Sequence, residues 1–451
     1  DPAGIVGRLG RRDDAPHSDW LRVTIDSYLD RQTGFVFAVN PRGVQYDAQI
    51  SQDLNEDRGW DAVWDVATAV DAEGWTAEMR IPLSQLRFAA GEDEQTWGLN
   101  FSRYIARLGE TSYWSPLQSG GAAQISQAGD LVGLEGLQPR RRVELIPYAV
   151  GGITRAPGDA ADPFYQANAP TTRVGADLRY GITSNLTLSA TVNPDFGQVE
   201  ADPSFVNLSG FENFFPERRG FFLEGVEIFQ PTFPVFPALF HSRRIGRAPQ
   251  GGAADGAEYA DVPDATRIVA AGKVTGRAGG WTIGLFDAVT AREDARWIDA
   301  AGVQGRNTVE PSTNYSVGRL ARDFNGGRSS VGFLGSHTQR GMPEDGSLDF
   351  LTSSASMGGV DGRHRFADGR FEVSGSLIGS QVRGEAAAID RIQRSPVHRF
   401  NRPDAGYAGY DPTATTLEGY AASGLFRTLR GNWRVRAEAR LRSPGFEVND
   451  L

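Results

Sequence analysis

The chain lacks cysteine altogether, has few methionines and histidines, and contains no long apolar run. Without cysteine there are no disulfides and no thiolate metal sites. The histidines, at positions 17, 241, 337, 364 and 398, are too scattered to give a metal-site spacing. No stretch approaches the roughly 18 apolar residues that a membrane-spanning helix needs. The formal net charge of −10 argues against nucleic acid as a partner, because phosphate binding requires a basic surface.

Common catalytic motifs are also missing. The chain has no Gly-x-Ser-x-Gly elbow, no His-Glu-x-x-His pair and no phosphate-binding loop. Carboxylates such as Glu217 and Glu224 keep open one enzymatic alternative, a hydrolase of O-glycosyl bonds, because glycoside hydrolysis uses a pair of carboxyl groups. Nothing in their spacing favours catalysis over ordinary ion pairs, so the sequence argues against an enzyme.

What the sequence does contain is a repeated two-faced strand pattern, clearest at residues 433–442. One set of alternate positions is apolar: Trp433, Val435, Ala437, Ala439 and Leu441. The other set is charged: Arg434, Arg436, Glu438, Arg440 and Arg442. Because a β-strand sends successive side chains to opposite faces, this segment has one apolar wall and one charged wall.

Strands of this kind are joined alternately by short and by long connections. They are predicted at 142–154, 171–182, 185–195, 265–276, 281–291, 313–324, 328–339, 352–366, 370–382, 416–429 and 433–443. Tight turns are expected at 183–185, 277–280, 325–327, 368–369 and 430–432, and long connections near 155–170, 196–264, 292–312, 340–351 and 383–415. This sorting is typical of an outer-membrane β-barrel with apolar faces toward lipid and charged faces toward the lumen. The alternative is a soluble antiparallel sheet with one face exposed to solvent.

The region before residue 139 has a different composition. Most of the tryptophans lie there, among short strand candidates at 20–26, 34–40, 62–70, 74–81 and 95–103. Short strands with such turns favour a β-sandwich. We therefore predict an all-β chain: a sandwich over 1–138, incomplete at its N-terminus, then an antiparallel barrel of at least eleven strands over 139–451, truncated at its C-terminus. Since strand 142–154 leads into a long loop, and long loops of bacterial barrels face outside, the sandwich is expected in the periplasm.

Several segments resemble known families. Residues 75–88, followed by Trp97 to Arg103, resemble the closing strands of a family 9 carbohydrate-binding domain. Residues 193–203, 214–219, 222–225 and 242–247 are similar to the uncharacterised DUF5916 family. The resemblance implies a periplasmic-type sandwich joined to an outer-membrane barrel. It names an architecture and not a chemistry, because the function of that family is not settled.

The candidate sugar-binding residues of the first domain are aromatic or carry amide or guanidinium groups: Trp60, Trp64, Asn100, Arg103, Tyr113 and Trp114. Sugar rings stack on aromatic platforms, and polar groups at the rim bind their hydroxyls. The alternative is that the tryptophans are core, because Trp60, Ala62, Trp64 and Val66 share one strand face. We assign Trp75 and Trp97 to the core outright.

A calcium site is a second candidate. Asp53, Asn55 and Asp57 place oxygen-bearing side chains at alternate positions, as many calcium loops begin. The remaining EF-hand positions do not fit, so an acidic turn is the alternative. The resemblance to family 9 binding modules also implies structural calcium, and no other cofactor is expected.

The long insertion 196–264, together with the residue before it, contains the densest cluster of charged side chains. The predicted pore or plug residues are Asp195, Glu200, Asp202, Glu217, Arg218, Arg219, Glu224, Arg243 and Arg244, interleaved with phenylalanines. A loop this long is expected to have its own packing. We expect it to fold into or across the barrel mouth, as a selective gate or as a static plug.

Together these patterns predict an outer-membrane protein with lipid around its barrel and a periplasmic carbohydrate-binding domain. The expected role is uptake, export or surface anchoring of a glycan or a related ligand. The competing hypothesis is a carbohydrate-active hydrolase with an N-terminal binding module.

Overall fold

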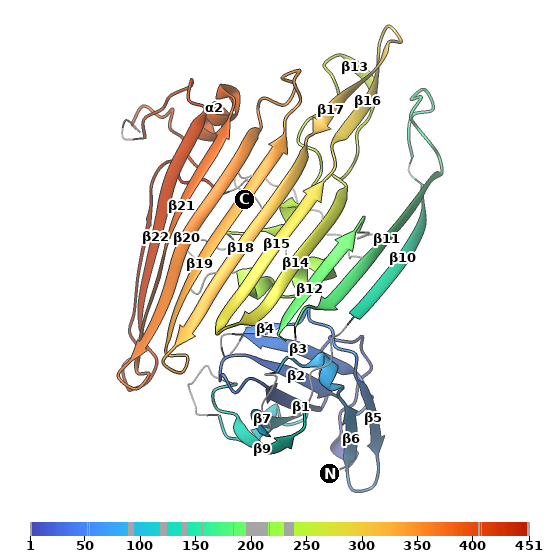
Figure 1. The fold of residues 1–451 in the computed structure, drawn as a ribbon. Coiled ribbons are helices and arrows are strands. Elements are labelled where there is room, and N and C mark those ends of the chain that lie inside the picture. The colour runs from blue at the N-terminus through green and yellow to red at the C-terminus, as the bar shows by residue number, and fades with distance from the viewer. Residues whose placement is uncertain are drawn as a thin grey trace.

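The computed structural model describes residues 2–51, 53, 55–88, 94–117, 124–137, 143–155, 157–183, 185–194, 215, 217–229, 239–404, 406 and 408–448. The fold is all-β, as predicted. A small N-terminal sandwich lies beyond one end of a large antiparallel sheet (Figure 1). No helix in the described ranges is long and apolar enough to span a membrane.

The N-terminal domain is built on a seven-stranded sheet and a two-stranded hairpin. The strands are β1 (Trp20–Asp26), β2 (Gly34–Val39), β3 (Gln45–Ser51), β4 (Asn55–Asp57), β5 (Asp65–Val70), β6 (Trp75–Arg80), β7 (Glu94–Ile105), β8 (Glu110–Tyr113) and β9 (Gly129–Glu135). The sheet has the order β4-β3-β2-β1-β7-β8, with β9 also paired to β7, and β5 pairs with β6. The five predicted strands are confirmed; β3, β4, β8 and β9 were not predicted.

One face of this sheet makes the main core of the domain. Trp60, Trp64 and Trp97 are each only 4% exposed and pack there, with the β5–β6 hairpin closing the layer. The ring of Trp60 tilts against that of Phe35, with ring centroids 5.0 Å apart. The opposite face of the sheet carries a second, smaller hydrophobic cluster that includes Val36, Ala48 and Ile125.

The large sheet contains eleven strands, each antiparallel to its neighbours in chain order. They are β10 (Val143–Thr154), β11 (Ala169–Gly181), β12 (Leu186–Val192), β14 (Ile268–Ala278), β15 (Trp281–Thr290), β18 (Ser312–Phe324), β19 (Ser329–Gly341), β20 (Thr352–Phe366), β21 (Phe371–Gly384), β22 (Thr416–Thr428) and β23 (Arg436–Arg442). All the strands predicted after residue 139 are confirmed. The three-stranded sheet β13 (Ala257–Asp261), β16 (Glu293–Asp299) and β17 (Gln304–Glu310) was not predicted and extends beyond the long-loop ends.

The short connections have the backbone geometry that their sequences predict. Between β18 and β19, Asn325, Gly326 and Gly327 take φ angles of 54°, 64° and 78°. Glycine and asparagine tolerate this left-handed region better than other residues do. A Cβ on Gly327 would also lie 2.8 Å from Nε2 of Gln32, so this turn allows the sandwich to approach closely.

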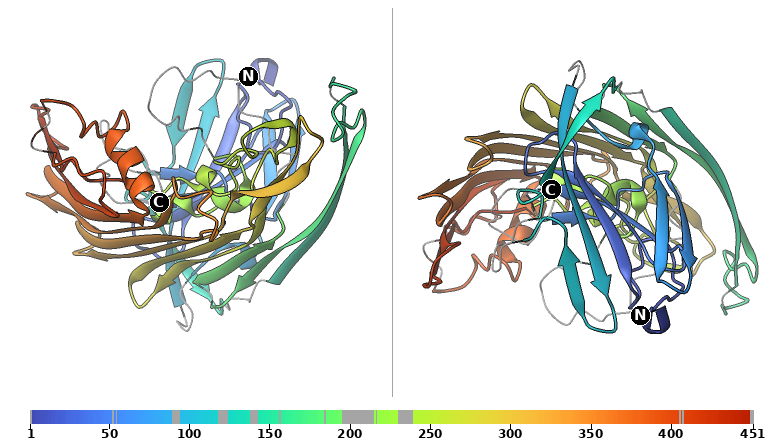
Figure 2. Two further views of the ribbon diagram at one scale, coloured as in Figure 1. Left: turned by 90° about the horizontal axis from the view of Figure 1, so that it is seen from above. Right: turned by 90° about the horizontal axis from the view of Figure 1, so that it is seen from below.

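Viewed along the strands, the sheet is a curved trough and not a closed cylinder (Figure 2). Among the described residues, the edge strands β10 and β23 do not pair with each other. The antiparallel barrel-type sheet is therefore confirmed, while closure is not seen in this chain.

The convex face of the trough is apolar, as predicted. Leu285, Phe333 and Leu377 are about half exposed there, and Leu441 of β23 is 57% exposed. At the short-turn rim, aromatic rings border this band: Phe371 stacks on Phe366 and on Phe426 with centroid distances of 5.4 and 5.9 Å. Aromatic borders of this kind flank the lipid-facing band of outer-membrane barrels.

A polar row follows on the convex face toward the long loops. Its members lie opposite one another on successive strands: Asp287, Ser316, His337, Ser356, Gln381 and Glu418. Hydrogen bonds connect members of this row, such as that from Oγ of Ser316 to Asp287, 2.6 Å long. The apolar surface therefore ends on both sides in side chains suited to a polar boundary.

The concave face differs from the uniformly charged lumen that we predicted. Its central part is an apolar core in which Phe286 contacts Phe222, Phe229 and Phe240 of the insertion. Helix α1 (Gly220–Leu223) and the turn Val226–Phe229 lie inside the trough, and α2 (Ala386–Arg394) lies at its long-loop end. Charged inward side chains gather instead near the short-turn rim, where Arg319 pairs with Asp361.

The sandwich docks at this short-turn rim. Arg277 of β14 pairs with Asp30, and its guanidinium lies 6.0 Å from the ring centroid of Tyr28. The backbone N–H of Gly225 donates to Oδ2 of Asp57 over 2.6 Å. The sandwich therefore contacts both the large sheet and the insertion.

Candidate functional site

The open face of the sandwich sheet carries a cavity of about 360 Å³. Residues from β1, β3, β4, β7 and β8 line it, because alternate positions of these strands point away from the tryptophan core. The lining is rich in hydroxyl, amide, carboxylate and guanidinium groups. We call it the sheet cavity. Its size and polarity are those of a small-molecule site.

A hydrogen-bonded cluster around Glu56 organises the sheet cavity. Arg22 Nη2 donates to Glu56 Oε1 over 2.7 Å and to Gln124 Oε1 over 2.8 Å. The hydroxyl of Tyr46 donates to Glu56 Oε2 over 2.6 Å. Burial acts to raise the pKa of Glu56, but the bonds from Arg22, Tyr46 and Gln124 hold it below its usual value. Burial and the bond to Glu56 raise the pKa of Tyr46, so the pair stays as carboxylate and phenol.

Aromatic side chains stand beside this cluster. Trp20 and Tyr104 are partners on neighbouring strands, and both line the sheet cavity together with Tyr113. Tyr113 is 44% exposed, so its ring is accessible to a ligand. An aromatic surface beside a rigid set of polar groups is the arrangement that sugar recognition requires.

The predicted sugar-binding residues are only partly brought together. Tyr113 lines the sheet cavity. Asn100 also lines it, but its amide is engaged with the backbone of Ser115, in bonds of 2.9 and 3.0 Å. The assignment of Trp60 and Trp64 to a sugar site is wrong, because both are buried in the opposite core.

The other two predicted sugar-binding residues lie outside the sheet cavity. Arg103 alternates with the cavity-lining Ser102 and so points to the other face of β7. Trp114 is 60% exposed and packs edge-on against Phe101, with ring centroids 6.2 Å apart. Sequence alternation alone did not show which strand face was the core.

The predicted calcium residues do not share one site. Asp53 Oδ1 accepts backbone N–H groups of residues 124 to 126, over 2.8 to 3.1 Å. Asp57 instead accepts from Gly59 and Gly225, and burial raises its pKa. The side chain of Asn55 lies outside the described part of the structure. Calcium at this segment stays a prediction.

A different acidic group is close enough to hold a cation. Carboxylate oxygens of Asp13, Asp47 and Asp61 lie within 4.8 Å of one another. The guanidinium of Arg12 reaches all three, at 3.7, 2.5 and 3.2 Å respectively. Arg12 thus already supplies the positive charge that this group needs.

Several described charges of the insertion are held by ion pairs and hydrogen bonds. Glu217 pairs with Arg219 over 2.7 Å, and Arg219 Nη1 and Nη2 donate to the carbonyls of Ile245 and Ser242. Arg244 is 5% exposed and donates to the carbonyl of Val448 over 2.8 Å. Arg218 precedes Arg219, and Arg243 lies in the turn Ser242–Arg244. Asp195, Glu200 and Asp202 lie outside the described residues.

The carboxylates of the hydrolase alternative are bound to arginines. Glu224 lies 3.2 Å from Arg179 of β11, which ties the insertion to the wall of the trough. Burial acts to raise the pKa of Glu217, but Arg219 and Ser242 hold it below its usual value. A catalytic acid needs the opposite shift, so this arrangement favours a structural role for both residues.

Comparison with known proteins bears on the second domain. The family model described as Domain of unknown function (DUF5916) matches residues 139–451. The chain belongs to this family. The search of curated proteins found no match. The resemblance of the first domain to family 9 carbohydrate-binding domains stays a prediction, since the family match covers only the second.

Solved structures show a weak similarity. The high-pH structure of Pseudomonas putida OprB has 9% identity and a TM-score of 0.28, with 95% of this chain and 89% of that chain covered. The crystal structure of Pseudomonas aeruginosa OpdQ has 8% identity and a TM-score of 0.21, with 94% and 92% covered. TM-scores this low do not establish a shared fold.

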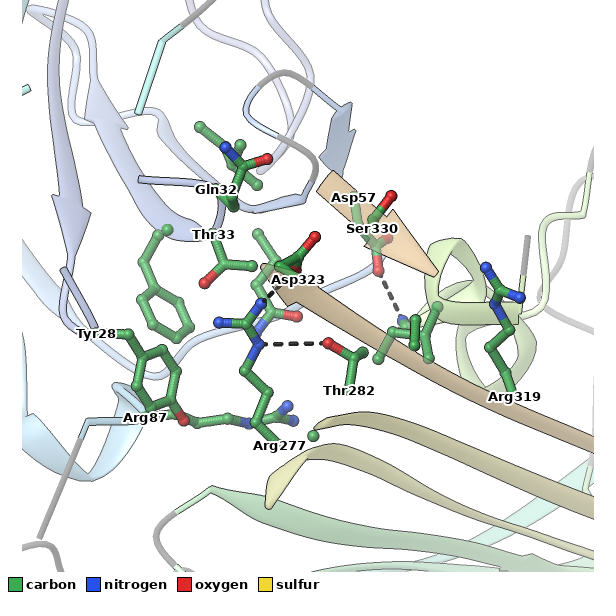
Figure 3. Close-up of a pocket in the computed structure, with 18 of the residues that line it drawn as sticks. Tyr28, Gln32, Thr33, Asp57, Arg87, Arg277, Thr282, Arg319, Asp323 and Ser330 are labelled. Carbon is green, nitrogen blue, oxygen red and sulfur yellow. Dashed lines mark hydrogen bonds and ion pairs between the residues drawn. The ribbon is translucent and has the colours of Figure 1, made fainter. Parts of the chain in front are cut away.

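This DUF5916 chain has a second cavity, of about 150 Å³, between the sandwich, the insertion and the short-turn rim (Figure 3). We call it the junction cavity. Tyr28 and Gln32 reach it from the sandwich, and Arg277 and Asp323 from the large sheet. No sequence pattern pointed to it, because its walls come from distant segments.

Proposed function

We propose that this protein is an outer-membrane β-barrel protein that binds a carbohydrate or a related hydroxylated ligand and takes part in its transport. The trough's apolar convex face with an aromatic border carries the membrane part of the proposal. Lipid would cover that face, and the sandwich would stand at the periplasmic mouth.

The ligand part rests on the sheet cavity. Its Glu56 cluster is assembled in advance, so a ligand hydroxyl meets oriented partners such as Arg58 and Thr111 in the same lining. Tyr113 offers a partly exposed ring at the edge. Because these polar groups are already held in place, fewer side chains lose conformational entropy when a ligand binds.

Two tyrosines of similar exposure allow a matched test of the ligand. Tyr113→Ala removes a ring from the sheet cavity, whereas Tyr410→Ala removes a ring that is 40% exposed and lies in the second domain, away from the cavity. On a glycan array with the purified chain, we expect Tyr113→Ala to weaken binding at least tenfold, about 1.4 kcal/mol or more, and Tyr410→Ala to leave it unchanged. Equal losses in both variants would contradict the assignment of this cavity.

The membrane part is tested separately. Intact cells treated with protease should retain the sandwich, because it is shielded at the periplasmic side. Purified protein that partitions into liposomes through its convex face would support the proposal. Removal of the sandwich by protease added outside the cells would show that the sandwich faces outward, opposite to the proposed orientation.

A further inference from the structure

The junction cavity contains a buried arginine that forms no direct ion pair among the described residues. Arg363 of β20 is only 8% exposed. Within the described part of the chain it makes no ion pair, and its one hydrogen bond runs from Nη2 to the carbonyl of Gly327 over 3.4 Å. Its Nε has no acceptor among the described residues. Buried arginines are normally paired, so this position calls for a negative group.

A second unmet donor lies beside it. Ser330 of β19 is the direct antiparallel partner of Arg363, and both side chains line the junction cavity. The buried Oγ of Ser330 has no hydrogen-bond partner in the described residues. Two neighbouring donors without acceptors on one wall indicate an acceptor that enters from the cavity.

The acidic residues nearby are already engaged. Asp323 pairs with Arg277 over 3.3 Å, and Asp57 accepts from the backbone of Gly59 and Gly225. The other arginine of this wall, Arg319, is held by Asp361, with Nη2 and Oδ2 2.9 Å apart. Asp323 and Glu372 act on Arg363 electrostatically, but their ion pairs are made with other arginines. A water molecule would complete the hydrogen bonds of Arg363, whereas an anion would also give it a direct ion pair.

We propose that the junction cavity binds a small anion through Arg363 and Ser330. Its volume of about 150 Å³ exceeds the ~30 Å³ that a single water takes up in the liquid. A guanidinium beside a hydroxyl suits the oxygens of a phosphate or a carboxylate. The facing wall includes Phe35 and Ile50, so an organic anion such as a uronic acid also fits the lining.

The test measures anion binding to the whole chain in detergent micelles by isothermal titration calorimetry. The probes are inorganic phosphate and glucuronate, with glucose as the uncharged counterpart of glucuronate. Arg363→Met removes the charge, and Arg436→Met is the matched control on the inner face of β23, outside the cavity. We expect saturable binding of at least one anion, weakened at least tenfold in Arg363→Met and unchanged in Arg436→Met.

Several outcomes would overturn this proposal: no binding of either anion, equal binding by Arg363→Met, or glucose binding as tightly as glucuronate. Binding of phosphate alone would assign an oxyanion site, and binding of glucuronate alone an acidic-sugar site. Should Arg363→Met fail to fold, Ser330→Ala replaces it, with an expected loss of severalfold. This site is separate from the sheet cavity, so Tyr113→Ala should leave anion binding intact, and failure of one proposal leaves the other standing.

Discussion

Glu372 joins three strands of the large sheet through one buried carboxylate. Its carboxylate on β21 is 2% exposed and accepts from Nε of Arg365 over 2.8 Å and from Nε of Arg427 over 2.7 Å. It therefore bridges the three strands β20, β21 and β22 at the short-turn rim. Replacement by glutamine keeps the shape and one acceptor but removes the charge between two arginines.

The expected loss follows from the burial of this bridge. Breaking a buried ion pair costs about 3–5 kcal/mol, because the remaining charge stays buried without a partner. Arg365 and Arg427 keep 23% and 39% of their side-chain surface exposed, so solvent relieves part of the loss. We therefore expect Glu372→Gln to lower the free energy of unfolding by about 2–3 kcal/mol.

The measurement is equilibrium unfolding in urea of the protein in detergent micelles, followed by tryptophan fluorescence. The matched control is Glu438→Gln, since Glu438 also bridges two arginines, Arg436 and Arg440, but on the exposed edge strand β23. Its unfolding midpoint should not change measurably. If both variants unfolded at the same urea concentration, burial would not explain the contribution of Glu372 to the free energy of unfolding.

Two further predictions concern the sandwich. Trp64→Ala should lower the free energy of unfolding of the sandwich by about 3–5 kcal/mol, because it removes a buried indole. Trp114→Ala, at an exposed position, should change that free energy little. A stable Trp64→Ala variant that had lost only glycan binding would restore the sugar-site interpretation. Burial and the neighbouring carboxylates raise the pKa of Asp13 from 3.8 to about 6, so the stability it contributes below pH 3.8 is lost as the pH rises through 6. Asp13→Asn should therefore raise the Tm at pH 7.5 and leave it unchanged near pH 3.5, and a Tm gain that did not depend on pH would contradict the shifted pKa.

The strands and tight turns of the large sheet could be predicted from the sequence because both depend on residues that are close together along the chain. Alternation between apolar and polar residues, with turns such as Asn325-Gly326-Gly327, is enough to place every strand of the large sheet. The strands β4 and β8 were missed because they are short and polar, and pairing with longer neighbours holds them in the sheet. The β16–β17 extension was hidden for a related reason, since it looks like a polar loop.

The sites were much less predictable. The series Trp60, Ala62, Trp64 correctly defined a strand-like face, but nothing in it distinguished a core face from a ligand face. Glu56 and Arg22 carried no motif, and they meet only because β1 and β4 belong to one sheet. Likewise, Arg363, which forms no direct ion pair in the described part of the chain, looks in the sequence like any other charged residue of a two-faced strand.

The sequence by itself determined the class of the protein: an all-β chain whose long strands each carry an apolar face. These follow from periodicity, which depends only on neighbours along the chain. The tertiary structure decided that the insertion packs phenylalanines on the concave face, that Trp60 and Trp64 lie in the core, and where the two cavities lie. Those outcomes depend on which distant side chains meet, and local preference carries no information about that.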